Sequence, residues 1–437
     1  MSVASEALSG VHKSELLLFF TLLQLCVIVL AGRIGANLAL RWGQSAAVGE
    51  IIIGIILGPT LFGWLWPDAF NFVFRSTPGD AMQILSQIGL ILLMFQIGME
   101  FEFSHLAEKE HRRSVTRIAV ASMVVPFGLG YALGYWMTPV LTPQANPTAA
   151  ALFVGTAFSI TALPILGRML IEFDIARKPL GVIAISAAAI NDVVGWLLLA
   201  LVTMLAVSGF DAAQFGSTLV LLLVYVAVCW WGVRPLLRWC VRHLGGAEGW
   251  SNNLLGVILV LVFVSAIVTY KLGIFAIFGG FMLGVLLHDQ PQFVDAWRRH
   301  IGQFVNVFFL PIFFTYTGLR TDIGGLDSLG LWGWCAIVVL AACLGKYLPS
   351  YLAARSAGMS HGESQIVGVM MNTRALMELI VINIGYDLGV ISKNVFTMLV
   401  IMAIVSTVIT TPVLRHYLPK LGYRQVKAHV PEEVTAD

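Results

Sequence analysis

Asp192 is a carboxylate in the middle of the apolar stretch GVIAISAAAINDVVGWLLLALVTMLAV. It lies about ten residues from either end of a predicted membrane-spanning helix, where a charged side chain costs about 2.5–3.5 kcal/mol on insertion scales. Acidic residues at such depth mark ion pathways and proton relays, and the alternative is an Asp that only pairs with another helix. No other acid is expected at the centre of a span. We interpret Asp192 as a site that binds a cation or a proton.

Three further side chains carry oxygens and are candidates to complete an ion site with Asp192. They lie near it if span 5 is broken beside Asp192, as argued below. Asn191 precedes it, and SITALPIL (159–166) supplies Ser159 and Thr161. Carboxylate, carbonyl and hydroxyl oxygens suit hard alkali cations, so a proton and a cation would compete for the same place. Competition at one site is enough for antiport if only the loaded forms cross the membrane. Asn191 could orient Asp192 or cap a broken half-helix, and the alternative for it is hydrogen bonding between helices. The alternative for Ser159 and Thr161 is back-bonding to the helix.

The composition indicates a multi-pass membrane protein. The 437 residues are 58% hydrophobic and 11% charged, with a mean hydropathy of +0.86. Runs of roughly twenty apolar residues are what a bilayer core requires. We predict thirteen all-α spans, at about 15–32, 45–63, 82–101, 115–138, 148–170, 178–208, 215–241, 251–270, 274–288, 300–318, 328–352, 363–387 and 393–414.

The same sequence gives no sign of a cofactor site or an enzyme. No glycine-rich nucleotide loop, HExxH or GxSxG is present, and the five Cys show no metal or disulfide spacing. Residues 1–14 are polar and lead into a full-length span, so no cleavable signal is expected. We therefore expect no cofactor, no metal beyond a transported alkali cation, and no nucleic-acid partner.

The charge pattern predicts the orientation. Most Lys and Arg fall in the odd-numbered loops and the C-terminal tail, such as Arg112, Arg113 and Arg117, whereas the even loops hold few, such as Lys271. Cytoplasmic loops carry the excess of positive charge. We expect a transmembrane domain over 1–414 with its N-terminus outside, followed by a short cytoplasmic tail over 415–437, in the cell membrane.

Similar segments recur in one order, each pair seven spans apart, which indicates an internal repeat. Because seven is odd, the second copy enters the membrane from the opposite side, as in secondary transporters with alternating access. The pairs are GEIIIGIILGP (49–59) with FGGFMLGVLLHD (278–289), LLMFQIGMEFEF (92–103) with IFFTYTGLRTDI (312–323), and SITALPIL (159–166) with MNTRALMEL (371–379).

Spans 5 and 12 are predicted to be broken helices. Span 5 contains Pro164, which removes a backbone donor, close to several hydroxyl residues. Span 12 carries polar groups unsuited to lipid: Asn372, Thr373, Arg374 and Glu378. Half-helices that meet near the midplane line the ion site in transporters of this kind. We expect the two breaks to cross, with Asp192 facing the crossing.

The two charged residues of span 12 are four positions apart. Arg374 and Glu378 would share a helix face and can pair. We favour a structural network that stabilises the break over direct contact with the ion.

Three segments resemble the monovalent cation/proton antiporter superfamily, especially its second branch. They are SITALPILGRML, AAAINDVVGWLLLAL and GVMMNTRALMELIVINIG, and they are most similar to the plant cation/proton exchangers and their bacterial relatives. The resemblance covers essentially the whole membrane region. It implies thirteen helices in a dimerisation domain and a mobile core domain, a homodimer, and a span 6 Asp that binds cation and proton in turn.

The chain departs from the family pattern at two places. Electrogenic members have Asp-Asp where this chain has Asn191-Asp192, and the Asn form is associated with electroneutral exchange. Lys346 aligns with a span 11 lysine that the family places near the ion-binding Asp, but the missing acid leaves open that it neutralises a helix end. Glutathione-gated potassium efflux relatives carry a nucleotide-binding domain, which is not expected in 415–437.

Three classes of function compete. The first is a proton-coupled antiporter for K⁺ or Na⁺, with K⁺ favoured by the similarity to the plant exchangers. The second is a sodium-coupled organic-anion symporter on the related bile-acid transporter fold, which would not need the Asn191-Asp192 pair. The third is a channel or a membrane enzyme, but no selectivity filter or catalytic constellation is visible. The sequence favours the antiporter.

Overall fold

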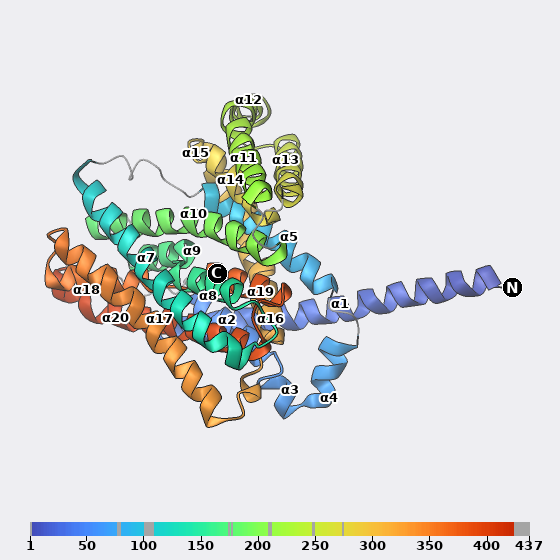
Figure 1. Cartoon of the computed structure of the whole chain (residues 1–437). Helices are drawn as coiled ribbons and strands as arrows, with labels where there is room; N and C mark the ends of the chain where they lie inside the picture. Colours follow the sequence, from blue (N-terminus) through green and yellow to red (C-terminus); the bar gives the residue numbers. More distant parts are fainter. Residues whose placement is uncertain are drawn as a thin grey trace, which may run out of the picture. The chain divides into compact units, whose positions relative to one another are not determined.

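A computed structural model describes residues 2–76, 80–99, 109–173, 175, 178–208, 212–246, 250–272 and 275–423. Every regular element within these ranges is helical, which confirms the all-α class (Figure 1). The α-helices are α1 (Ser2–Arg41), α2 (Ala46–Ile56), α3 (Phe62–Leu65), α4 (Pro67–Phe70), α5 (Asp80–Met99), α7 (Lys109–Leu141), α8 (Pro147–Ser159), α9 (Leu163–Glu172), α10 (Pro179–Ser208), α11 (Ala212–Val228), α12 (Arg234–Leu244), α13 (Asn252–Lys271), α14 (Ala276–Leu287), α15 (Pro291–Trp297), α16 (Leu310–Arg320), α17 (Leu329–Ser356), α18 (His361–Met371), α19 (Leu376–Asp387) and α20 (Lys393–Tyr417).

Many of these helices are long and apolar enough to cross a membrane. Within the described ranges there are nine such helices, and a tenth if the pair Pro291–Gly302 and Val305–Gly325, bent by 44°, is one span. Shorter apolar helices, α2, α8 and α14, overlap the predicted spans 45–63, 148–170 and 274–288. The protein is therefore a multi-pass membrane protein, and the number thirteen stays a prediction.

Two predicted boundaries are wrong for local reasons. Span 2 was expected to be helical over 45–63, but α2 ends at Ile56 because Gly58 and Pro59 follow in a turn. Span 10 was expected at 300–318, but its helical path starts at Pro291 and bends. Two π-helical turns, Arg298–Gly302 and Val305–Phe309, interrupt its regular hydrogen bonding, and such turns kink helices.

The chain divides into two compact units. The first comprises Met1–Gly35, Glu50–Phe101 and Ala212–Gly324, and the second comprises Ala36–Gly49, Glu102–Asp211 and Gly325–Asp437. Every candidate site residue from the sequence lies in the second unit. The assignment of one part to dimerisation and the other to transport stays a prediction.

Glycines in the first unit allow helix pairs to touch along their backbones. A Cβ on Gly318 of α16 would collide with the backbone of Gly54 in α2. A Cβ on Gly98 of α5 would collide with α14, including Gly284. Span 2 therefore crosses span 10, and span 9 crosses span 3. The predicted repeat pairs span 2 with span 9 and span 3 with span 10. The contact of span 2 with span 10 in one copy therefore corresponds to the contact of span 9 with span 3 in the other. This reciprocity supports the repeat.

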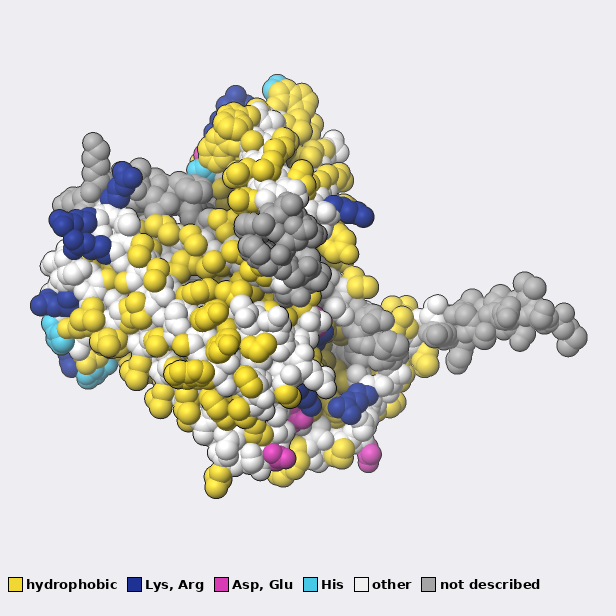
Figure 2. Space-filling view, viewed as in Figure 1, with side chains coloured by type: hydrophobic (Ala, Val, Ile, Leu, Met, Phe, Trp, Pro, Cys, Tyr) yellow, Lys and Arg dark blue, Asp and Glu magenta, His cyan; other side chains and the backbone are white. Residues whose placement is uncertain are grey.

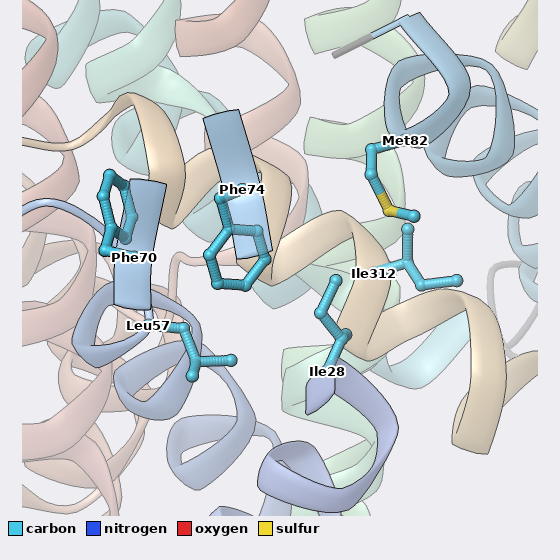
Figure 3. Close-up of a cluster of buried hydrophobic side chains, with 6 residues drawn as sticks. All are labelled: Ile28, Leu57, Phe70, Phe74, Met82 and Ile312. Atoms are coloured by element: carbon cyan, nitrogen blue, oxygen red, sulfur yellow. The ribbon is translucent and has the colours of Figure 1, made fainter. Parts of the chain in front are cut away.

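The first unit also has an apolar cluster at the end of α2. Figure 3 shows its six side chains, drawn from α1, α4, α5, α16 and the segments beside them, pointing toward one another. The phenyl rings of Phe70 and Phe74 lie 5.7 Å apart between centroids. Close packing of this kind holds membrane helices together through van der Waals contacts, because lipid tails are as apolar as these side chains. The members are Ile28, Leu57, Phe70, Phe74, Met82 and Ile312.

The second unit is built around α7, which packs against α8 and α17 (Figure 1). The outward side chains of these helices are apolar, including Val124 and Trp136 of α7 and Leu344 of α17. In Figure 2, Lys and Arg side chains gather at the edge where α18 and the end of α17 lie, away from the apolar surface. This segregation fits a lipid-facing surface with one basic end.

Candidate functional site

Span 5 is broken at the place where a proline removes a helix bond. α8 ends at Ser159, α9 begins at Leu163, and Ile160 between them is extended, with φ −72° and ψ 144°. In a continuous helix the N–H of residue 164 would bond the carbonyl of Ile160, but Pro164 has no N–H. The N–H of Leu163 bonds Thr161 O at 3.0 Å instead of continuing the α8 pattern. The predicted break is confirmed.

Span 12 is broken as well. α18 ends at Met371 and α19 begins at Leu376. Ala375, the residue before α19, has φ 76° and ψ −108°, a conformation that an alanine rarely adopts and that costs on the order of 1–3 kcal/mol. Only surrounding contacts can hold such a residue, and strain of this kind gathers at functional sites.

The two breaks cross and bond to each other. The N–H of Ala162 donates to Thr373 O at 3.0 Å, and the Thr161 hydroxyl donates to Met371 O at 3.2 Å. The hydroxyl of Thr407 on α20 accepts from the Arg374 N–H at 3.3 Å. The crossing predicted from the sequence is therefore present, with its freed backbone groups buried in protein.

Asp192 of α10 faces this crossing. Its side chain is 1% exposed and borders a narrow space with Ile160 from the first break, Met377 and Val381 from α19, and Trp196 one turn further along α10. Neither carboxylate oxygen has a hydrogen-bond partner among the described residues. The groups that act on it electrostatically are the Lys346 ammonium and the backbone N–H of Leu163 at the start of α9. A buried carboxylate with unused oxygens is suited to take up a small cation or a proton.

Asn191 and the hydroxyl residues have definite partners. Asn191 Nδ2 donates to Ser122 Oγ on α7 at 2.8 Å and to Thr161 Oγ1 at 3.4 Å. Ser159 donates to Thr156 O at 2.8 Å, which is the back-bonding alternative for this residue. Sequence reasoning missed Ser122, whose only signal was a hydroxyl inside an apolar span.

Lys346 of α17 caps the end of α8. Its side chain is fully buried, and Nζ donates to Ser159 O at 2.5 Å and to Ile160 O at 2.6 Å. These carbonyls lie at the negative end of α8, where a cation is stabilising. The second one is the carbonyl that Pro164 leaves free. These contacts match the alternative in which Lys346 neutralises a helix end. Asp192 also interacts with the Lys346 ammonium electrostatically.

Arg374 and Glu378 form a buried ion pair. Arg374 Nη1 lies 3.4 Å from Glu378 Oε1, and both side chains are 0% exposed. The guanidinium also donates to Ala157 O of α8 at 3.2 Å and Ala342 O of α17 at 2.9 Å. The pairing was predicted correctly but its geometry was not, because Arg374 lies in the break and Glu378 in the first turn of α19, not on one helix face.

Glu378 also corrects the expectation that Asp192 is the only acid at a span centre. It is fully buried beside the break of span 12, and its Oε2 has no partner among the described residues. Its Oε1 accepts from Arg374, whereas neither oxygen of Asp192 has a hydrogen-bond partner in the described part of the chain. Asp192 therefore remains the better candidate for a titrating, ion-binding group.

The remaining polar residues of span 12 lie at the same crossing. Thr373 donates to Thr410 Oγ1 at 3.4 Å. Asn372 is 7% exposed, and its Oδ1 has no partner within the described part of the chain. Among the described residues near the breaks, the side-chain oxygens without a hydrogen-bond partner are both oxygens of Asp192, Oδ1 of Asn191 and of Asn372, and Oε2 of Glu378.

An all-helical membrane protein with a buried carboxylate beside two crossed, broken helices belongs to the class of ion-coupled secondary transporters. The family described as sodium/hydrogen exchanger, transmembrane, matches residues 24–420, and the chain is a member of it.

Similar proteins agree with this assignment. The Na⁺/H⁺ antiporter NhaS4 of Synechocystis sp. is 39% identical over 407 residues, covering 92% of this chain and 98% of that protein. The K⁺/H⁺ antiporter 1 of Saccharomyces cerevisiae is 30% identical over 431 residues, covering 94% of this chain. The chain spans about half the length of the plant and yeast relatives it matches. The sodium proton antiporter MjNhaP1 of Methanocaldococcus jannaschii has the same fold, with a TM-score of 0.57, 16% identity, and coverage of 92% of this chain and 97% of that one.

Proposed function

We propose that the protein exchanges protons for monovalent cations across the cell membrane, with K⁺ favoured and Na⁺ as the alternative. Asp192 binds the cation or the proton in turn, and Asn191, Thr161 and Ser159 complete the site. The observation that carries this proposal is the burial of Asp192 at the crossing with both carboxylate oxygens unused among the described residues. A group in that position gains from binding either a cation or a proton.

The charges around the crossing support electroneutral exchange. Two acids, Asp192 and Glu378, face two bases, Lys346 and Arg374, and all four side chains are buried. A proton on Asp192 or a monovalent cation beside it adds the same single charge. If only these two loaded forms cross between the faces, one cation moves for one proton and no net charge is transferred.

The contacts of the crossing suggest how the site stays intact as it moves. The broken ends are tied to each other and to α17 by Lys346 and Arg374, which bind carbonyls of α8. Asp192 and the breaks would therefore move together as one body in alternating access. Dimerisation is proposed from the family resemblance alone, and chemical cross-linking in liposomes with size analysis tests it.

The choice of ion rests on similarity. Relatives with similar sequences are named as antiporters of Na⁺ in one case and K⁺ in another, which supports a monovalent cation as substrate. The similarity to plant cation/proton exchangers favours K⁺. The organic-anion symporter has no observation in its favour, since the site offers small oxygen ligands in a narrow, buried space.

The experiment is ion exchange in proteoliposomes. Purified protein is reconstituted with a trapped pH dye, a pH difference is imposed, and Li⁺, Na⁺, K⁺ or Rb⁺ is added in turn. We expect a cation-dependent proton flux, largest with K⁺. No flux with any of the four ions would contradict antiport, and a flux with Na⁺ but not K⁺ would contradict the proposed preference.

A further inference from the structure

Two hydroxyl groups from different segments hold the amide of Asn191 in one orientation. Asn191 Nδ2 lies 2.8 Å from Ser122 Oγ and 3.4 Å from Thr161 Oγ1. Each hydroxyl has one proton, and both protons are already engaged. Ser122 donates to Ala119 O at 3.1 Å, and Thr161 donates to Met371 O at 3.2 Å. Both hydroxyls can therefore only accept from Asn191.

The opposite orientation of the amide is unfavourable at both contacts. With the amide flipped, Oδ1 would face two oxygens that have no proton left to donate. Asn191, Ser122 and Thr161 are each 0% exposed, so water cannot compensate. The orientation thus follows from the hydrogen-bond network, which is the basis on which amide orientations are assigned.

This orientation leaves Asn191 Oδ1 free. It is a buried oxygen without a hydrogen-bond donor among the described residues, on the residue next to Asp192, whose two oxygens are also free. Amide and carboxylate oxygens are the kinds of ligand that hard cations prefer, and here two consecutive residues supply them. A proton carried by Asp192 needs no such second ligand.

We infer that Ser122 is a positioning residue for cation binding: its hydroxyl accepts a hydrogen bond from the Asn191 amide and so leaves Oδ1 to act as a ligand of the transported cation. This inference rests on the proposed exchange function. Ser122 itself touches neither ion. It acts from α7, outside the two broken spans and α10.

The test is a comparison of Ser122→Ala with a matched serine. Ser406 of α20 is also 0% exposed and also donates to the carbonyl three residues earlier, Ala403 O at 3.0 Å, but no described side chain donates to it. In proteoliposomes we expect Ser122→Ala to raise the KM for the cation by about three- to tenfold, the size of one hydrogen bond, with the maximal rate within twofold of wild type. Ser406→Ala should leave the KM unchanged.

A double-mutant cycle shows whether Ser122 acts through Asn191. In an Asn191→Ala background, Ser122→Ala should cause no further rise in KM, because the group it positions is gone. Equal KM values for wild type and Ser122→Ala, or a full additional effect in the Asn191→Ala background, would overturn the inference while the exchange function stands. Absence of exchange by the wild-type protein would overturn the proposed function and this inference with it.

Discussion

Lys346 Nζ donates to the carbonyl oxygen of Ile160 at 2.6 Å, the carbonyl that would accept from residue 164 if span 5 were a continuous helix. Pro164 at that position has no N–H to give. A buried carbonyl without a donor is costly, so the lysine replaces the missing backbone bond with a charge-assisted one. Pro164 breaks the helix, and Lys346, far away in the sequence, stabilises the break. The two residues therefore act together.

Replacement of Lys346 tests whether it stabilises the break in span 5. Lys346→Met leaves the carbonyls of Ser159 and Ile160 without a donor, and we expect a loss of about 2–4 kcal/mol in the free energy of unfolding. Lys346→Gln can still donate to one carbonyl and should lose less. Thermal unfolding in detergent measures both, with Lys271→Gln at the end of α13 as the control. An order of stability with Met equal to or above Gln would contradict the capping role.

The ion pair of span 12 gives a second stability prediction. Glu378→Gln leaves the buried Arg374 guanidinium without its counter-ion, and removing one partner of a buried pair costs about 3–5 kcal/mol. Glu363→Gln is the matched control, because Glu363 also lies in the first turn of a half-helix but is partly exposed in a capping box. It should cost about 1 kcal/mol or less. Similar losses in the two variants would contradict the assignment of Glu378 to a structural network.

The stoichiometry follows from the number of free carboxylates. With Asn191 in place of a second acid, one proton trades for one cation, so a membrane potential should not drive exchange. Proteoliposomes with equal K⁺ on both sides are assayed with valinomycin, which holds the potential at zero, and without it, when net charge movement would build up a potential; Na⁺ is the tested ion if it is transported. A severalfold change in rate or final pH difference with potential would contradict one-for-one exchange. Lys346, as a second proton carrier, would then be the residue to examine.

If the potential has no effect, Lys346→Gln should still exchange one proton for one cation. Its rate or stability should fall, because the end of α8 is less well capped. The same clamped assay on this variant measures the stoichiometry directly. An onset of potential dependence in Lys346→Gln would show that the lysine contributes charge to the transport step, contrary to the capping role.

The sequence predicted the breaks and their crossing because both depend on local chemistry. Pro164 removes one helix bond, and the polar run that begins at Asn372 cannot face lipid, so both features are visible without a structure. The depth of Asp192 was visible for the same reason. The end of α2 was harder to predict from the sequence, because Gly58 and Pro59 lie inside an apolar run that is typical of a longer helix.

The hydrogen-bond partners could not be predicted, because they join residues far apart in the chain. A buried serine such as Ser122 usually bonds its own helix, and it does so here, but its second bond to Asn191 depends on how α7 packs against α10. The contacts of Arg374 with α8 and α17 depend in the same way on the crossing. The four-residue spacing correctly predicted Glu378 as the partner of Arg374. It wrongly placed both residues on one helix face.

The measurement that tests the central claim most directly is proton flux through Asp192→Asn in proteoliposomes. Asparagine keeps the shape of the side chain but cannot take up a proton or neutralise a cation, so we predict a folded protein with no cation-driven proton movement. Thermal unfolding and the yield of reconstituted protein establish folding, and Asp387→Asn, at the end of α19, is the matched substitution expected to retain exchange. Exchange above about a tenth of the wild-type rate in Asp192→Asn, which is a rise of less than about 1.4 kcal/mol in the transport barrier, would contradict the assignment of Asp192 as the exchange site.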